Sequence, residues 1–283
     1  MPSPGNISGR HRLQSLTEIR TLLHERGLSP RQRLGQNFLH DHNILSKLVD
    51  ASEVQSGDIV LEIGPGTGSL TEELLFRGCE VVACELDRGL FGLLKDRFGD
   101  SIRLIQGDCL IKKQLNPEVV EQLTGRSWRL VANLPYQVAS PLLVTLLMSH
   151  PDCVGSVVTI QHEVAQRLMA RSGTASWGVL SILVQRLAEV SLITKVSNTC
   201  FWPQPKVTSA CVKVIPRRER KLESSKEFAL FITSLFSNRR KQLGSILGRD
   251  FKFPETIAAD ARPSTLTIEQ LELLYESFRT SVN

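Results

Sequence analysis

From residue 58 to residue 216, short apolar runs alternate with stretches in which apolar residues recur at helical spacing. The runs predicted to be strands are Ile59–Ile63, Glu80–Glu85, Ile102–Gln106, Arg129–Asn133, Ser156–Gln161, Val190–Val196 and Ser209–Ile215. The stretches predicted to be helices are Ser69–Arg77, Arg88–Arg97, Pro117–Leu123, Ser140–Ser149, Glu163–Ala170 and Trp177–Leu187. This alternation is typical of an α/β fold in which helices cover both faces of a mostly parallel sheet. Because no clear helix separates the last two strands, we expect an antiparallel edge there.

Helical patterns also flank the sheet region on both sides. Ser15 and Glu18 fit a capping box at the start of an amphipathic helix, and a second short helix is expected after Asp41. Downstream, apolar residues repeat at helical spacing over 228–236 and again over 266–278. These patterns divide the chain into an N-terminal leader with an amphipathic helix (1–30), a sheet domain (31–218) and a small C-terminal α-helical domain (219–283).

Composition narrows the class of protein. Hydrophobic residues make up 41% of the chain and charged residues 22%, which is ordinary for a globular protein and excludes a disordered one. The longest nearly apolar stretches, Leu142–Met148 and Val179–Val184, fall far short of the ~20 residues that span a bilayer, so we expect no membrane partner. The N-terminus lacks a secretory signal pattern, and the six cysteines include no Cys-x-x-Cys pair and no zinc-like spacing. We therefore expect reduced thiols, no metal site and a cytoplasmic location.

The charge is unevenly distributed along the chain. The net charge is +5, but residues 1–47 carry +4 and residues 205–252 carry +8, which leaves the remainder acidic. Two basic flanks around an acidic middle suit a polyanionic partner such as nucleic acid, and they suit an ordinary solvated surface equally well.

The first motif that carries chemistry follows the first predicted strand. Gly64, Gly66 and Gly68 stand between that strand and a helix, where glycine lets the backbone approach a ligand and adopt positive φ. A plain tight turn would also explain these glycines. A dinucleotide fingerprint requires glycine where Ser69 stands, and the lysine of a P-loop is absent from the motif. The loop therefore does not demand a phosphate group in its ligand.

Two acidic residues at neighbouring strand ends extend this site. Glu85 closes the next strand and can accept hydrogen bonds from both hydroxyls of a ribose. Asp108 follows the third strand and can accept from the amino group of an adenine, although by itself it could equally cap the next turn. Together with the glycine loop, these acids predict an adenosine pocket at the carboxyl edge of the sheet. An adenosine ligand without a phosphate cradle favours S-adenosylmethionine over NAD or ATP.

A turn after the fourth predicted strand suggests a methyl acceptor. It consists of Asn133, Leu134, Pro135 and Tyr136. The exocyclic amine of adenine is a poor nucleophile because its lone pair is delocalised into the ring. The Asn133 side-chain oxygen and the Leu134 backbone carbonyl could hold its two N–H groups and direct the lone pair at the sulfonium methyl. Pro135 would fix the turn and Tyr136 would stack on the base, while an ordinary turn with a half-buried tyrosine is the alternative.

Several motifs along most of the chain carry a resemblance to a known family. They are Leu34-Gly-Gln-Asn-Phe-Leu39, Glu62-Ile-Gly-Pro-Gly-Thr-Gly68, Glu85-Leu-Asp87, Gly107-Asp108, Asn133-Leu-Pro-Tyr136, Cys200-Phe-Trp-Pro-Gln-Pro-Lys-Val207 and Asn238-Arg-Arg-Lys241. From about Arg31 to about Arg262, the chain resembles the ribosomal RNA adenine N6-dimethyltransferases, often called the KsgA family. The resemblance implies a Rossmann-like S-adenosylmethionine-dependent methyltransferase domain at 31–218 and a helical RNA-binding domain at 219–283.

The resemblance also assigns site residues. Together with the glycine loop, it implies cofactor contacts at Asn37, Leu39, Gly64, Gly66, Glu85, Asp108 and Asn133. It implies that Asn133, Leu134 and Tyr136 hold the target amine, and that Phe201 provides the second face of an aromatic clamp on the base. By the same resemblance, Arg239, Arg240 and Lys241 meet RNA phosphates.

The implied reaction transfers methyl groups to N6 of two adjacent adenosines near the 3′ end of small-subunit rRNA, within a pre-mature ribosomal subunit. A large-subunit rRNA adenine N6-methyltransferase of the resistance type shares the Asn133–Tyr136 turn and the helical tail, and a DNA adenine methyltransferase is excluded only by the resemblance. A non-catalytic ribosome assembly factor would be expected to lose Gly64, Glu85, Asp108 or Asn133, and all four are present. No oligomeric state is indicated.

The chain departs from the family pattern in three places. Pro203-Gln204-Pro205 stands where three prolines are usual, and His162 stands where a lysine is common. The leader before Gln36 and Asn37 is longer than usual, and it could cover the cofactor or touch RNA.

Overall fold

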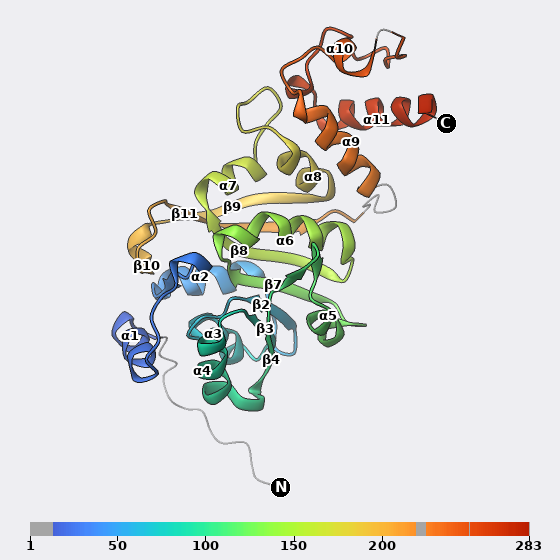
Figure 1. The fold of residues 1–283 in the computed structure, drawn as a ribbon. Coiled ribbons are helices and arrows are strands. Elements are labelled where there is room, and N and C mark those ends of the chain that lie inside the picture. Colours follow the sequence, from blue (N-terminus) through green and yellow to red (C-terminus); the bar gives the residue numbers. More distant parts are fainter. Residues whose placement is uncertain (1–13, 219–224, 249, 283) are drawn as a thin grey trace.

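The computed structural model describes residues 14–218, 225–248 and 250–282. Seven strands form one mixed sheet in the order β4-β3-β2-β7-β8-β11-β9 (Figure 1). Their bounds are β2 Ile59–Ile63, β3 Glu80–Glu85, β4 Ile102–Gln106, β7 Trp128–Asn133, β8 Cys153–Gln161, β9 Ala188–Val196 and β11 Ser209–Pro216. The first five of these in sheet order run parallel, whereas β11 pairs antiparallel with both β8 and β9. The expected antiparallel edge is confirmed.

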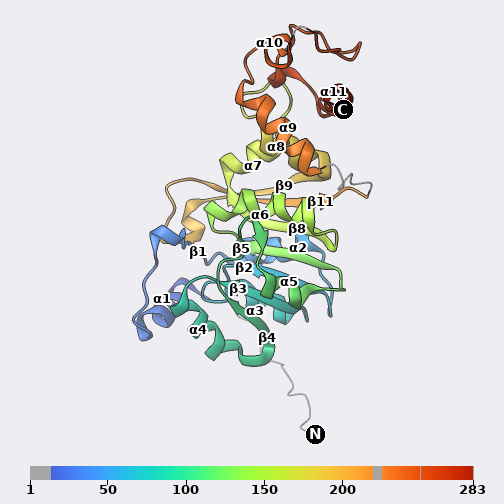
Figure 2. The ribbon, with the colours of Figure 1, turned by 45° about the vertical axis from the view of Figure 1, so that its right-hand side comes forward.

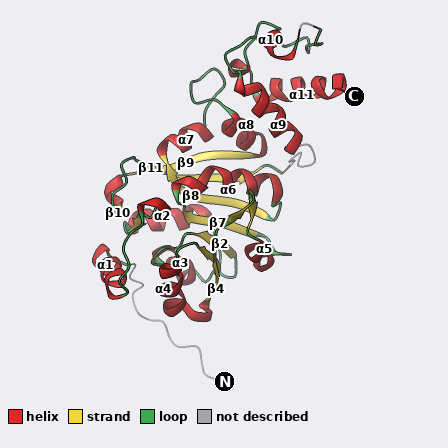
Figure 3. Cartoon of the chain, in the orientation of Figure 1, coloured by secondary structure: helices red, strands yellow, loops and turns green. Residues whose placement is uncertain are grey.

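Helices cover both faces of this sheet (Figure 3). Successive residues of a strand point to opposite faces, and in β2 Leu61 belongs to one apolar cluster while Val60 belongs to another. The Leu61 cluster includes residues of α5 (Pro117–Leu123) and α6 (Tyr136–Ser149). The Val60 cluster includes residues of α2 (His42–Ser52) and α3 (Ser69–Phe76), and α4 (Arg88–Phe98) packs on β4. The predicted Rossmann-like α/β architecture with a helical C-terminal region is confirmed.

Helix α6 begins earlier than the sequence pattern predicts. The expected start at Ser140 was wrong, because α6 begins at Tyr136 and holds Pro141 inside it. A proline near a helix start usually marks the first turn, since its missing N–H has no intrahelical partner there. Here the helix continues past Pro141, although proline has no N–H and one hydrogen bond of the helix is therefore missing. As a result, Tyr136 is the first residue of α6, directly after the turn that carries Asn133.

Several short elements complete the fold. β1 (Phe38–Leu39) pairs antiparallel with β10 (Phe201–Trp202), with Leu39 opposite Phe201 and Phe38 opposite Trp202. β5 (Leu110–Ile111) pairs with β6 (Gln114–Leu115). The remaining short helices are η1 Gln32–Leu34, η2 Gly99–Ser101, α7 His162–Leu168, η3 Asn198–Cys200 and η4 Pro263–Thr265. The β1–β10 ladder joins two motifs that are far apart in the chain.

The C-terminal helices are α9 Ser225–Ser237, α10 Leu243–Leu247 and α11 Ile268–Val282. Of these, α9 and α11 contact α8 (Val179–Leu187), and Figure 2 shows α9 beside α8 from a second direction. Helix α10 adds Leu243 to the same apolar cluster. Arg186 on α8 places its guanidinium 4.4 Å from the centre of the Phe228 ring, and its Nε lies 2.8 Å from Glu272 Oε1. The helical region therefore shares an apolar core with α8. The division at residue 218 stays a prediction, and residues 219–224 beside it lie outside the described part.

The leader contributes one helix, α1 (Leu16–Glu25). Its predicted capping box is confirmed, because the Ser15 side chain accepts from the Glu18 N–H and the Glu18 carboxylate accepts from the Ser15 N–H at 2.6 Å. Ile19 and Leu23 are buried against Phe38 and α4. Residues 1–13 of the leader lie outside the described residues. Among the helices described, none is both long enough and apolar enough to cross a bilayer.

Candidate active site

A cavity of about 320 Å³ lies at the carboxyl ends of the parallel strands. It is lined by every residue predicted to contact the cofactor or the target base, namely Asn37, Leu39, Gly64, Gly66, Glu85, Asp108, Asn133, Leu134, Tyr136 and Phe201. Arg239, Arg240 and Lys241 do not line it; they follow α9. The fold thus gathers two predicted half-sites, one for the cofactor and one for the methyl acceptor, in one cavity.

The glycine loop after β2 is held between two walls. Gly64 and Gly66 both have positive φ, at 69° and 65°. A Cβ atom on Gly64 would lie 3.2 Å from the Pro135 ring, and one on Gly66 would lie 3.0 Å from the Phe38 ring. Both positions therefore favour glycine, because the positive φ is strained for other residues and an added Cβ would push the neighbouring ring by a few tenths of an ångström.

Glu85 is anchored at the end of β3 with its carboxylate in the cavity. It is only 5% exposed; its Oε1 accepts from the Asp87 N–H at 2.8 Å and its Oε2 accepts from the Gly66 N–H at 3.3 Å. Burial raises the pKa of Glu85 to about 7, against the lowering effect of these backbone donors. Asp87 in turn accepts from Gln36 Nε2 at 3.3 Å and pairs with Arg31 Nη1 at 3.0 Å. Asp87 therefore links the segment before Asn37 to Glu85, since its carboxylate contacts Gln36 and Arg31 and its N–H donates to the Glu85 carboxylate.

Asp108 caps a turn, as one of the two readings of the sequence predicts, and its role as an adenine acceptor stays a prediction. Its Oδ1 accepts from the Leu110 N–H at 2.9 Å, so it caps the turn after β4, and it also lines the cavity. S-adenosylmethionine needs an acceptor for the ribose hydroxyls, an acceptor for the adenine amino group and a backbone cradle without side chains. Glu85, Asp108 and the Gly64–Gly66 loop supply these groups, with Leu86 and Leu90 as apolar lining. The residues present fit this cofactor.

The acceptor side of the cavity is built around Asn133. Its Nδ2 donates to the Asn37 carbonyl at 3.0 Å, which fixes the amide so that Oδ1 is the end left to accept from a ligand. The Leu134 N–H donates to the Thr159 carbonyl at 3.1 Å, and the Tyr136 hydroxyl bonds Ser209 Oγ at 2.8 Å. Burial raises the pKa of Tyr136, so this ring remains neutral. The turn is thus held rigidly from three directions.

Comparison with known proteins decides the family. The sequence model described as ribosomal RNA adenine dimethylase matches residues 27–278. The chain belongs to this family. As a member of the dimethylase family, it is a methyltransferase that uses S-adenosylmethionine as its methyl donor.

Individual relatives agree with this family. The ribosomal RNA small subunit methyltransferase A of Pediococcus pentosaceus is 41% identical over 232 residues, covering 80% of this chain and 78% of the relative. The protein of the same name from Leuconostoc mesenteroides is 36% identical over 280 residues, covering 93% and 95%. A dimethyladenosine transferase from Plasmodium falciparum superposes with a TM-score of 0.72 at 26% identity, covering 87% of this chain and 98% of the other. The 23S rRNA methyltransferase ErmE superposes with a TM-score of 0.65 at 23% identity over 86% of this chain and 100% of its own, which shows a common fold.

Phe201 forms a fixed part of the cavity wall in this dimethylase. Its side chain is 1% exposed, and it packs with Val196 and Cys211 in the apolar layer on the α2 side of the sheet. Pairing with Leu39 holds its backbone. The clamp role of Phe201 stays a prediction, as do the contact roles of the other site residues.

Sequence reasoning left many pocket residues of the dimethylase without a role, and three of these are charged or aromatic. They are Arg33, Phe38 and Glu62. Arg33 and Phe38 flank the Gln36–Asn37 motif, so their proximity to it was the available signal. Arg33 is also the one cation among the described residues that line the cavity. Glu62 lies two residues before Gly64, but it stands inside an apolar strand, and the sequence pattern gave no sign that it lines the cavity.

Glu62 makes the stability of the dimethylase depend on pH. Burial raises the pKa of Glu62 to about 8, even though Thr71 Oγ1 donates to its Oε2 at 2.6 Å. Because the folded protein holds this proton more tightly than the unfolded chain, the free energy of unfolding falls as pH rises from about 5 to about 8. Glu62→Gln stays neutral and can still accept from Thr71. Between pH 5 and pH 8, we expect the free energy of unfolding of Glu62→Gln to rise relative to that of the wild type by more than about 1.4 kcal/mol, the equivalent of one pKa unit.

Urea unfolding at pH 5, 6, 7 and 8 measures this difference. Comparison with the wild type at each pH cancels the parallel contribution of Glu85. Identical slopes for wild type and Glu62→Gln would show that Glu62 is ionised in the folded protein.

Proposed function

We propose that this enzyme dimethylates N6 of two adjacent adenosines near the 3′ end of small-subunit rRNA. The observation that carries the proposal is the shared cavity, in which the Asn133–Tyr136 turn faces the same space as Glu85 and Asp108. A donor pocket for an adenosine cofactor beside two acceptors for an amine is the arrangement that adenine N-methylation requires. The names of the curated relatives support the small subunit as the substrate particle. We further propose that the substrate is a pre-mature subunit in the cytoplasm.

In the proposed mechanism, the protein positions the amine. Bound S-adenosylmethionine supplies an electrophilic methyl group on its sulfonium. Asn133 Oδ1 and the Leu134 carbonyl accept the two N–H groups of the target adenine, which favours a pyramidal nitrogen with its lone pair directed at the methyl. Tyr136 stacks on the base after it has left its helix. The amine becomes acidic as it is methylated, so its proton passes to solvent without a strong base.

Parallel labelling tests the proposal. Tritiated S-adenosylmethionine is incubated with the full chain and unmethylated small subunits, large subunits or DNA duplex, and the digested products are resolved into mono- and dimethyladenosine. Label on the small subunit alone, ending as dimethyladenosine, is expected. Label on the large subunit would identify a resistance-type enzyme, and no label with cofactor still bound would identify an assembly factor.

We propose that the basic residues after α9 contact RNA, and that Arg239 differs in role from Arg240 and Lys241. Arg239 is half-buried, and its guanidinium donates to the Trp177 carbonyl at 2.9 Å and the Ala175 carbonyl at 3.2 Å. Arg240 and Lys241 are exposed. Arg239 therefore supports the loop before α8, which leaves Arg240 and Lys241 as the candidates for phosphate contacts.

Charge reversal of Arg240 and Lys241 together is expected to weaken binding to small subunits. Two lost phosphate contacts would reduce the slope of log affinity against log salt by roughly 1.4–1.8. Filter binding at several salt concentrations measures this slope. Lys95→Glu on α4, an exposed lysine in another layer, is the matched control. A double variant with unchanged affinity and slope would exclude an RNA arm at this position.

A further inference from the structure

The segment Gln14–Glu25 touches the walls of the active-site cavity from outside. It precedes residue 27, where the family match begins, and none of its residues lines the cavity. It nevertheless contacts two loops of the site. One is the cofactor loop, Gly64–Gly68, and the other is the segment Cys200–Val207, which we call the target-base loop because it carries Phe201. These contacts indicate that the segment supports the site, although it lies outside the family motifs in the sequence.

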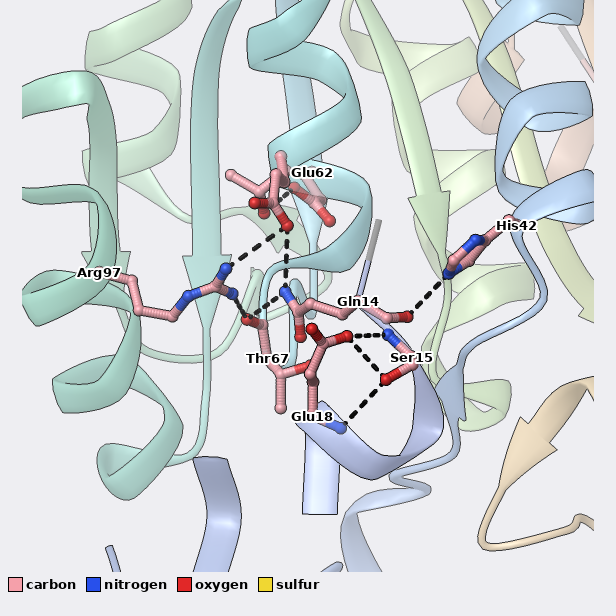
Figure 4. Close-up of polar contacts among 9 residues, drawn as sticks. Gln14, Ser15, Glu18, His42, Glu62, Thr67 and Arg97 are labelled. Carbon is pink, nitrogen blue, oxygen red and sulfur yellow. Dashed lines mark hydrogen bonds and ion pairs between the residues drawn. The ribbon is translucent and has the colours of Figure 1, made fainter. Parts of the chain in front are cut away.

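The first contact is made by Gln14 on the cofactor loop. Gln14 is 5% exposed, and its Nε2 donates to the Thr67 carbonyl at 3.2 Å and lies 3.5 Å from Glu72 Oε2. Its own carbonyl bonds His42 Nε2 at 3.0 Å on α2. Figure 4 shows Gln14 and Arg97 reaching the Thr67 carbonyl from opposite sides. This carbonyl lies between Gly66 and Gly68, so the two donors fix a peptide plane in a loop whose glycines leave it otherwise soft.

The second contact runs through α1. Ile19 and Leu23 pack against Phe38, whose ring lies against the backbone of Gly66. The Phe38 ring also stacks on Trp202, with 6.2 Å between ring centres and 25° between planes.

Trp202 carries this contact to the target-base loop. Trp202 directly follows Phe201 in the chain. The guanidinium of Arg20 lies over the Trp202 ring, 5.1 Å from its centre. A cation over an indole face is attractive, and more so where water is partly excluded. One short helix thus supports the cofactor loop through Phe38 and the target-base loop through Trp202.

We propose that Gln14–Glu25 is a brace that preorganises both loops, with Gln14 and Arg20 as positioning residues. Fixing a binding loop in advance removes an ordering cost from the binding step. The cofactor arm of the brace depends only on cofactor binding, whereas the Arg20 arm rests on the proposed function.

The cofactor arm is tested with Gln14→Leu. Isothermal calorimetry with S-adenosylhomocysteine is expected to give a dissociation constant about 5- to 10-fold higher, the effect of one lost buried hydrogen bond. Hydrogen exchange of the amides over 64–70 in the free protein is expected to accelerate. Gln14→Lys, which keeps a donor for Thr67 and Glu72, is expected to restore both values. Thr21→Ala, at an exposed position of α1, is the matched control.

The Arg20 arm is tested by the split between two constants. Arg20→Ala is expected to raise KM for small subunits several-fold while the S-adenosylhomocysteine dissociation constant stays within about twofold, and Arg20→Lys is expected to recover much of the loss. Equal shifts in both constants would indicate a merely structural helix and overturn the Arg20 arm. Unchanged binding and exchange in Gln14→Leu would overturn the cofactor arm. A wild type that binds S-adenosylhomocysteine but labels no subunit would overturn the proposed function alone.

Discussion

Asn133→Ala is expected to slow methyl transfer by roughly 10²–10³-fold, the usual cost of deleting one preorganised polar group at a reacting centre. The substitution removes Oδ1, one of the two proposed acceptors for the target amine. The other contacts of the turn, from Leu134 to Thr159 and from Tyr136 to Ser209, do not involve the Asn133 side chain. The variant also loses the bond to the Asn37 carbonyl, so cofactor binding should weaken, but far less than transfer slows, and RNA binding should remain largely intact.

The measurement is a single-turnover rate at saturating S-adenosylmethionine, with binding of S-adenosylhomocysteine and small subunits measured separately. Asn43→Ala, at an exposed position on α2, is the matched control. Asn133→Asp separates the two functions of the amide, since it keeps an acceptor oxygen but loses the donor to the Asn37 carbonyl. Near-normal turnover in Asn133→Ala would refute the assigned mechanism.

Glu85→Ala is expected to weaken cofactor binding by roughly 100-fold or more. Two ribose hydroxyls donating to a carboxylate contribute about 1.5–3 kcal/mol each, and the Gly66 and Asp87 N–H groups also lose their acceptor. Calorimetry with S-adenosylhomocysteine gives the dissociation constant directly. Glu80→Ala, at the other end of β3 and paired with arginines, is the control. An unchanged constant in Glu85→Ala would remove Glu85 from the ribose site.

The same residue predicts how cofactor binding responds to pH. The pKa of Glu85 is raised to about 7 by burial in the free protein. Ribose hydroxyls stabilise the ionised carboxylate, so binding is strongest above pH 7 and weakens by up to about tenfold per unit below it. Glu85→Gln, which does not titrate, should flatten this part of the profile. A wild-type constant that is flat between pH 5.5 and pH 8 would show that Glu85 is already ionised before the cofactor binds.

Much of this site was predictable because each motif stands at the end of a predicted strand. Parallel strands bring their carboxyl ends to one edge, so Glu85, Asp108 and Asn133 meet there even though they are separated in sequence. The apolar runs of β2, β3 and β4 were clear enough to give their bounds as observed. The antiparallel edge follows from the absence of a clear helix between the last two strands, whereas the order of the strands in the sheet is seen only in the structure.

Other features leave no periodic trace in a sequence. The two-residue strands β1 and β10 are too short to show alternation, so the contact of Phe38 with Trp202 is visible only in three dimensions. The charge of Arg239 suggests a contact with RNA, but its guanidinium donates hydrogen bonds to two backbone carbonyls. The raised pKa of Glu62 depends on its burial in the sheet. Each of these features depends on surroundings that only the folded chain provides.

The β1–β10 ladder also constrains when this enzyme can become active. Its two strands place Leu39 beside Phe201 in the wall of the cavity, so neighbouring parts of this wall come from early and late in the chain. Contacts between residues so far apart in the sequence form late in folding, because the chain must lose the entropy of closing a large loop before the contact stabilises it. During synthesis, the glycine loop and the Asn133 turn emerge from the ribosome well before residue 202. A nascent chain of this enzyme therefore carries an incomplete cavity until most of the sheet has been made.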